Sequence, residues 1–70
     1  MDVRARVGLN LQNLRRDKGL SQEELAHRAD IHQTYISGVE RGRRNPSIEV
    51  LARLAAALEA DLQDLTRKRG

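Results

Sequence analysis

The sequence predicts an all-α fold, a compact bundle of about five short helices in one domain spanning residues 1–70. Apolar residues recur at steps of three and four, as on one face of a helix. Ser, Asp and Gly stand where such helices would begin and end. Aromatic residues make up only 1% of the chain, whereas Leu, Ala, Arg and Glu are frequent. The core must come from packing alone, because the chain has no Cys.

A first helix is predicted over about residues 2–17, ending near Gly19. Its apolar stripe consists of Val3, Val7, Leu11 and Leu14. A second helix begins after Ser21, where Glu24 completes the spacing of a capping box that satisfies two helix amides. Its buried face consists of Leu25, Ala26 and Ala29.

A third helix is predicted over about residues 33–41, ending at Gly42. Its buried residues are Ile36 and Val39. The joint before it consists of Asp30, Ile31 and His32 and contains no Gly. We expect Asp30 to take a positive φ there, because Asp reaches the left-handed region at less cost than most residues. Ile31 should be buried, and His32 is a poor N-cap.

A fourth helix follows Pro46, with Ser47 as its N-cap. Its apolar face consists of Ile48, Leu51, Leu54, Ala55 and Leu58. After a break near Glu59 and Ala60, a short fifth helix begins at Asp61. Leu62 and Leu65 lie on one side of it.

The formal net charge of +3 favours a polyanionic partner. Many of the cations fall in three clusters, which are Arg15, Arg16 and Lys18, then Arg41, Arg43 and Arg44, and last Arg67, Lys68 and Arg69. Taken singly, each cluster is equally well explained as a solvated helix end. The apolar spacing around the short joint is more specific, because it is the pattern of a helix-turn-helix, whose second helix enters the DNA major groove.

Three blocks, "LRRDKGLSQEELAHRA", "YISGVERGRRNPS" and "LARLAAALEADLQDL", stand in family order and spacing over about residues 11–65. On these blocks the chain resembles the phage-repressor and Cro-type (XRE) helix-turn-helix proteins, which implies a lambda-repressor-like DNA-binding domain. "TYISGVERGRRNPS" is similar to the small controller proteins of restriction-modification systems. The chain departs from the family at Asp30, where Gly is usual, and at His32, where Ser or Thr is frequent.

The resemblance implies that the exposed start of the third helix reads DNA bases. The candidate base-reading residues are Gln33, Thr34, Ser37 and Tyr35. Gln can bond bidentately to adenine, and Thr can contact a base or the thymine methyl group. Tyr35 lies beside the buried Ile36, so it should point outward or sideways. An ordinary polar helix face is the alternative for the first three residues, and partial packing is the alternative for Tyr35.

Other positions are implied to contact phosphate or to hold the reading helix. The candidate phosphate-binding residues are Gln22, Arg43, Arg44 and Asn45. Arg15 and Glu40 are implied to pair between the first and third helices. Gly8 and Gly38 fall inside predicted helices at a cost of roughly 1 kcal/mol each. Gly38 should permit close approach to DNA, whereas the sequence offers no reason for Gly8.

No grouping of nucleophile, base and orienting acid is present, so the sequence does not predict an enzyme. His27 and His32 have no third ligand nearby, so neither a metal nor another cofactor is expected. There is no signal-peptide pattern or apolar run of membrane-spanning length, which predicts a cytoplasmic protein with no membrane partner. A basic helical domain adhering to membranes is a weaker alternative.

The function predicted is a sequence-specific transcriptional regulator that binds double-stranded DNA. It would act by steric occlusion or by contacting RNA polymerase. A single recognition helix buries little surface, so a homodimer on a (pseudo)palindromic operator is expected. Its candidate interface residues are Leu62 and Leu65, which could equally close the monomer core. An antitoxin-type protein-interaction module that also binds DNA is the alternative.

Overall fold

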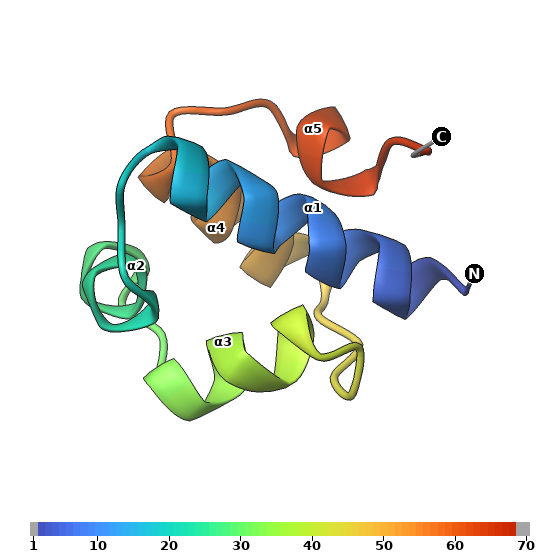
Figure 1. Ribbon diagram of the computed structural model, residues 1–70, viewed down its shortest axis with the longest axis horizontal. Helices are drawn as coiled ribbons and strands as arrows, with labels where there is room; N and C mark the ends of the chain where they lie inside the picture. Colours follow the sequence, from blue (N-terminus) through green and yellow to red (C-terminus); the bar gives the residue numbers. More distant parts are fainter. Residues whose placement is uncertain (1, 69–70) are drawn as a thin grey trace.

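The computed structural model describes residues 2–68, and its helices follow the predicted order (Figure 1). The helices are α1 (Val3–Asp17), α2 (Gln22–Ala29), α3 (Gln33–Glu40), α4 (Ile48–Ala57) and α5 (Leu62–Thr66). The prediction of an all-α bundle of about five short helices is therefore confirmed for the part of the chain that the structure describes.

The long α1 crosses the middle of the bundle and contacts both α3 and α5 (Figure 1). α2 packs against α3 and α4, and α4 also packs against α5. The second and third helices therefore stand as a pair whose support comes from α1 and α4. This arrangement leaves the far side of α3 free of other helices.

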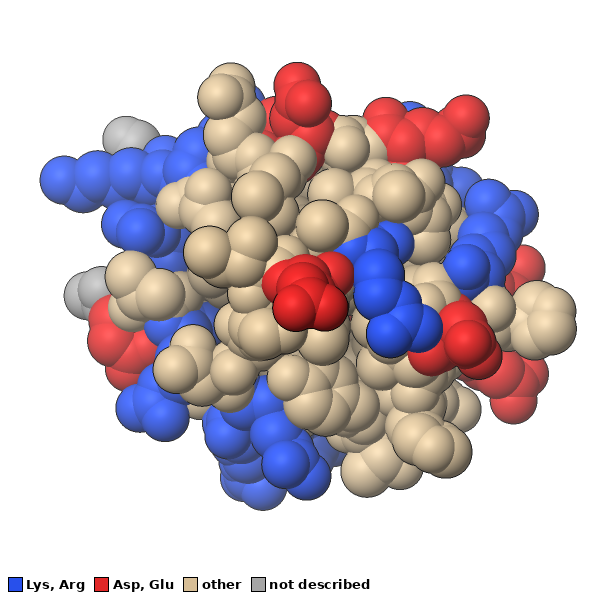
Figure 2. All heavy atoms as spheres, turned by 180° about the vertical axis from the view of Figure 1, so that it is seen from behind, with Lys and Arg blue, Asp and Glu red and all other residues tan. Residues whose placement is uncertain are grey.

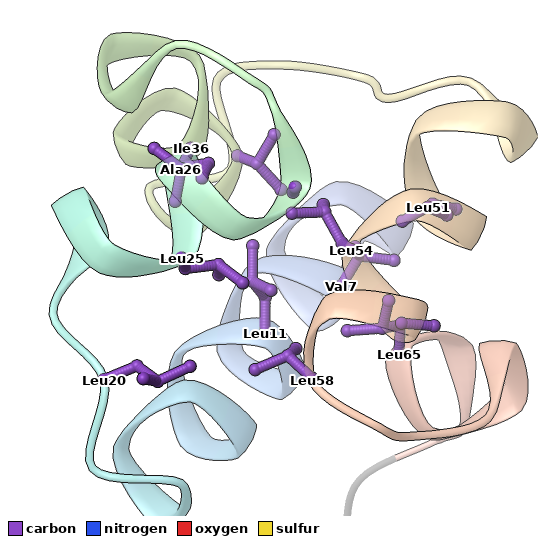
Figure 3. Packing of buried hydrophobic residues seen from close by; sticks show 13 residues of the cluster. Val7, Leu11, Leu20, Leu25, Ala26, Ile36, Leu51, Leu54, Leu58 and Leu65 are labelled. Carbon is purple, nitrogen blue, oxygen red and sulfur yellow. The ribbon is translucent and has the colours of Figure 1, made fainter.

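The hydrophobic core lies where the five helices meet (Figure 3). Its largest fully buried side chains are Leu11, Leu25, Ile36, Val39, Leu54, Leu58 and Leu65. Burying one such side chain contributes roughly 1.5–3 kcal/mol, so each helix is held mainly by the one or two large residues that it sends into the core.

Two residues placed in predicted apolar faces do not join the core. Val3 is 56% exposed and Ile48 is 73% exposed. Each is the first residue of its helix. The expectation for both is wrong because periodicity identifies a helix face but not how far the neighbouring helices extend along it.

The predicted helix ends are confirmed where they rest on capping residues. Ser21 Oγ accepts from the N–H of Glu24 at 3.0 Å, and Glu24 Oε1 accepts from the N–H of Ser21 at 2.9 Å. The backbone hydrogen bond from Ser21 lowers the pKa of Glu24 below its usual value. Ser47 and Asp61 are the N-caps of α4 and α5. The predicted break near Glu59 is also present, with Glu59 at a φ of 54°.

Two close contacts of α1 were not predicted. Asn10 is buried, and its Nδ2 donates to Leu65 O at 3.0 Å and to Arg67 O at 2.9 Å, which ties the end of α5 to α1. Gly8 lies against the end of α3, where an added Cβ would overlap Val39 O and lie 2.7 Å from Glu40 O. Gly8 is therefore explained by the close approach of two helix backbones.

Candidate nucleic-acid interface

The joint between α2 and α3 turns at Asp30, which adopts the left-handed conformation with φ 56° and ψ 50°. Its N–H donates to His27 O, and the N–H of Ile31 donates to Ala26 O at 3.0 Å. These bonds close the end of α2 as a left-handed helix cap does. The prediction that Asp30 ends the helix without Gly is confirmed, and Ile31 packs half-buried against the core.

His32 precedes α3 as its N-cap residue but offers no side-chain cap to the described residues of the helix. The prediction that His32 is a poor N-cap is therefore confirmed. Its consequence is that the first N–H groups of α3 remain beside the exposed side chains of Gln33 and Thr34. These groups can serve an external acceptor, such as a phosphate or a base edge.

α3 has one face in the core and one in solvent. Ile36 and Val39 are fully buried, whereas Gln33 and Thr34 are exposed. Ser37 is half-buried on the side shared with Thr34. The buried contacts hold the helix, so the solvent face can bind a partner without rearrangement of the core.

Tyr35, which was predicted to point outward or sideways, is half-buried and packs against the hydrophobic core, as in the alternative of partial packing. The guanidinium carbon of Arg44 lies over its ring, 5.6 Å from the centroid, within the range of a cation–π contact. Arg44 also covers Gly38, where an added Cβ would be 2.6 Å from Arg44 Cγ. Gly38 thus makes room for the Arg44 side chain, which is a different reason from the close DNA approach predicted.

The basic hollow is a depression along the exposed side of α3 and the loop after it. Its lining consists of Thr34, Ser37, Gly38, Arg41, Arg43 and Arg44. Two candidate base-reading residues and two candidate phosphate-binding residues thus share one surface. Arg41 adds a third cation that the sequence had placed only in a charge cluster. Asn45 is exposed in the same loop.

The distribution of charge agrees with this surface. Figure 2, seen from behind, shows blue Lys and Arg atoms at the lower edge of the molecule, where α3 and the following loop lie in Figure 1. Red Asp and Glu atoms lie at the upper edge, at the sides and in the middle of this face, mixed with further blue atoms, whereas the lowest edge shows blue and tan atoms. The edge that carries α3 is thus suited to an anionic partner.

Arg15 and Glu40 form the predicted pair between α1 and α3. Arg15 Nε donates to Glu40 Oε2 at 2.7 Å, and Arg15 Nη2 donates to Glu40 Oε1 at 3.0 Å. The Glu40 side chain is 2% exposed, and its hydrogen bonds raise the pKa of Arg15 above the usual value. A buried bidentate pair adds little net stability, because desolvation opposes the attraction, but it fixes the end of α3 in one place.

Gln22 belongs to the same polar network. Its Nε2 donates to Glu40 Oε1 at 3.0 Å. The amide was expected to bind phosphate, and in the structure its donor is directed toward the end of α3. A phosphate contact by this side chain would use the remaining N–H of the amide group.

The two candidate dimer residues differ in how far they are exposed to solvent. Leu62 is 38% exposed, whereas Leu65 is fully buried in the core of the chain. Leu65 therefore closes the monomer core, which was the stated alternative to a dimer contact, and its side chain has no surface left for a second copy. Within residues 2–68, no group of three His, Asp or Glu side chains could hold a metal ion, and no helix is long and apolar enough to cross a membrane.

Known proteins share this architecture and much of the sequence. A family model described as Helix-turn-helix matches residues 11–65. The HTH-type transcriptional regulator y4dJ of Sinorhizobium fredii is 53% identical over 58 residues, 83% of this chain and 75% of the relative. Control protein C.BamHI of Bacillus amyloliquefaciens is 38% identical over 65 residues, which cover 91% of this chain and 80% of the control protein. The crystal structure of the restriction-modification controller protein C.AhdI from Aeromonas hydrophila has a TM-score of 0.86 at 42% identity, covering 89% of this chain and 94% of that chain.

Proposed function

Because this chain belongs to the Helix-turn-helix family and is a DNA-binding transcriptional regulator, we propose that it reads duplex DNA with the N-terminal half of α3 in the major groove. The predicted resemblance to XRE-type and controller proteins is confirmed by the matches to this family. As a regulator of this class it binds DNA and catalyses no reaction. In this proposal it acts in the cytoplasm, and it regulates transcription by occluding a promoter or by contacting RNA polymerase.

The observation that carries the proposal is the shared surface of α3 and the basic hollow. Gln33 and Thr34 stand at the exposed start of the helix, and Arg41, Arg43 and Arg44 line the adjoining depression. Amide and hydroxyl groups can distinguish base edges in the major groove, whereas arginines bind the phosphates that flank it. Reading and holding groups are thus available side by side, on α3 and on the loop that follows it.

The experiment begins with selection of bound fragments from random duplex DNA, which supplies an operator. We then expect Gln33→Ala to lower the preference for operator over scrambled duplex by roughly 1–3 kcal/mol at one base position per half-site. Affinity for scrambled DNA should barely change, because phosphate contacts carry no sequence information directly. Equal losses on both duplexes, measured by fluorescence anisotropy, would show that Gln33 does not read a base.

We further propose that two copies bind a (pseudo)palindromic operator, with half-sites about one helical turn apart, roughly 34 Å. Leu62 and exposed parts of α4 are the proposed contact. We expect Leu62→Asp to disperse the dimer in sedimentation experiments, because the contact would bury an unpaired charge. Val3→Asp is the matched control, since Val3 is exposed at the start of α1. A dimer that survives Leu62→Asp would place the interface elsewhere.

A further inference from the structure

Arg53 on α4 reaches across to the joint between α2 and α3. Its Nη2 donates to Ala29 O at 2.9 Å and to Asp30 O at 2.6 Å. Both carbonyls belong to the end of α2, more than twenty residues earlier in the chain. A single side chain of the supporting helix thus bonds directly to the backbone of the turn.

The carbonyls at the end of a helix lack partners from their own helix, and this joint serves only some of them. The joint's own N–H groups bond to Ala26 O and His27 O. Within residues 2–68, the donor found at Ala29 O and Asp30 O is the guanidinium of Arg53. A cation is favoured there, because the carbonyl end of a helix carries partial negative charge.

The carboxylate of Asp30 adds little to this arrangement. Its Oδ2 lies 3.8 Å from Arg53 Nη2, but the Asp30 side chain is fully exposed and the Arg53 side chain is 49% exposed. Exposed ion pairs of this kind are weak. The two bonds to backbone oxygen therefore define the role of Arg53, and they act on the path of the main chain rather than on a side chain.

The outer side of the joint is not closed by packing alone. A hollow lies between the joint and α4, lined by Asp30, Ile31, His32, Tyr35, Val50 and Arg53. At the other end of α3, Glu40 is fixed by Arg15 through two hydrogen bonds. The end of α3 that carries Gln33 and Thr34 lies between the joint and the buried Ile36, so the path of the joint sets the direction in which that end begins.

We propose that Arg53 is a positioning residue for DNA recognition, which fixes the start of α3 by bonding to the backbone of the joint. The inference rests on the proposed reading of DNA by α3. Arg53 itself does not contact a base in this scheme. Loss of the Arg53 side chain frees the start of α3, while the Arg15–Glu40 pair still holds the end of that helix. The preference for operator DNA therefore falls more than the stability of the protein or its affinity for DNA of any sequence.

The test compares Arg53→Met with Arg28→Met, which removes the same charge from an exposed position on α2. Dissociation constants are measured for the selected operator and for scrambled duplex, at a temperature where each variant is folded. We expect Arg53→Met to lower the scrambled-to-operator ratio of dissociation constants by about tenfold, comparable to losing one base contact. Arg28→Met should leave that ratio unchanged, and Arg53→Lys should restore part of it.

Hydrogen exchange supplies a readout that needs no DNA. The N–H of Ile31 bonds to Ala26 O inside the joint, and its exchange should accelerate in Arg53→Met relative to the amides of α1. If Arg53→Met does not fold, the dissociation constants and the exchange of the Ile31 N–H are measured on Arg53→Gln and Arg53→Lys instead, and these variants test the positioning role. An unchanged ratio in a folded variant would overturn the proposal. Equal weakening on both duplexes with a flatter salt dependence would also overturn it, because Arg53 would then contact phosphate.

Failure of this proposal is distinct from failure of the proposed function. If the unmodified protein shows no preference for any selected duplex, DNA reading by α3 is refuted and the role of Arg53 falls with it. If the unmodified protein prefers its operator and Arg53→Met keeps that preference, only the positioning role is refuted.

Discussion

Replacing Gly8 with Ala should destabilise the protein, although the same change favours a helix. Gly8 lies in the middle of α1, where Ala is preferred over Gly by about 1 kcal/mol. However, the new Cβ would overlap Val39 O and lie 2.7 Å from Glu40 O, whereas ordinary van der Waals contacts begin at 3.4 Å. Both obstacles are backbone atoms of α3, so the helices must separate.

The magnitude follows from these opposing effects. Overpacking in a well-packed interior costs about 1–3 kcal/mol, and two backbone obstacles place Gly8 at or above the upper end. After the helix preference is subtracted, we expect a loss of about 2 kcal/mol. A chain of this length has a total stability of only about 4–10 kcal/mol. The melting temperature should therefore fall by roughly 8–16 °C.

The assay is thermal unfolding followed by circular dichroism at 222 nm, with Gly38→Ala as the matched control. Gly38 is also inside a helix, but its added Cβ would meet the Arg44 side chain, which can adopt another rotamer. Moving Arg44 also gives up its contact with the Tyr35 ring, so Gly38→Ala should lower the melting temperature by less than Gly8→Ala does. A melting temperature for Gly8→Ala within a few degrees of the unmodified protein would refute the argument that backbone contact between α1 and α3 requires Gly.

Two further results are expected. Arg43→Ala should weaken binding to operator and scrambled duplex alike and reduce the slope of log K against log salt by about 0.9 per subunit, since Arg43 is assigned to phosphate. An unchanged slope in a salt titration would count against that assignment. Glu24→Gln should lower the melting temperature above pH 4.5, because a carboxylate whose pKa is lowered by folding stabilises the folded state there. The two proteins should converge as the pH falls through the folded pKa, and a difference that persists at lower pH would contradict this cause.

The sequence predicts those parts of the fold that depend on neighbouring residues. The capping box at Ser21 and the left-handed turn at Asp30 are local, because the interacting groups lie within a few positions of each other. The apolar spacing likewise predicts Leu11, Leu54 and most of the other core residues correctly. Exposure of Val3 depends instead on where α1 extends past its neighbours, which no periodicity records.

The parts of the structure that the sequence does not predict depend on which helices cross and on how closely the crossing helices approach each other. Asn10, Gly8 and Arg53 each act on backbone atoms of a helix that is distant in the sequence. A polar residue or a glycine within an apolar stripe gives no indication of its partner until the crossing is known. For the same reason, the basic clusters could be recognised in the sequence, but the meeting of Arg41 with Thr34 in one hollow required the structure.

The bond from Asn10 to the end of α5 has a consequence for the order of folding. It joins residues 55 and 57 positions apart in a chain of 70. α2 and α3 can meet as soon as their short joint forms, whereas α1 can reach α5 only after the helices between them have been synthesised. The first of these five helices to be synthesised is therefore among the last to complete its contacts.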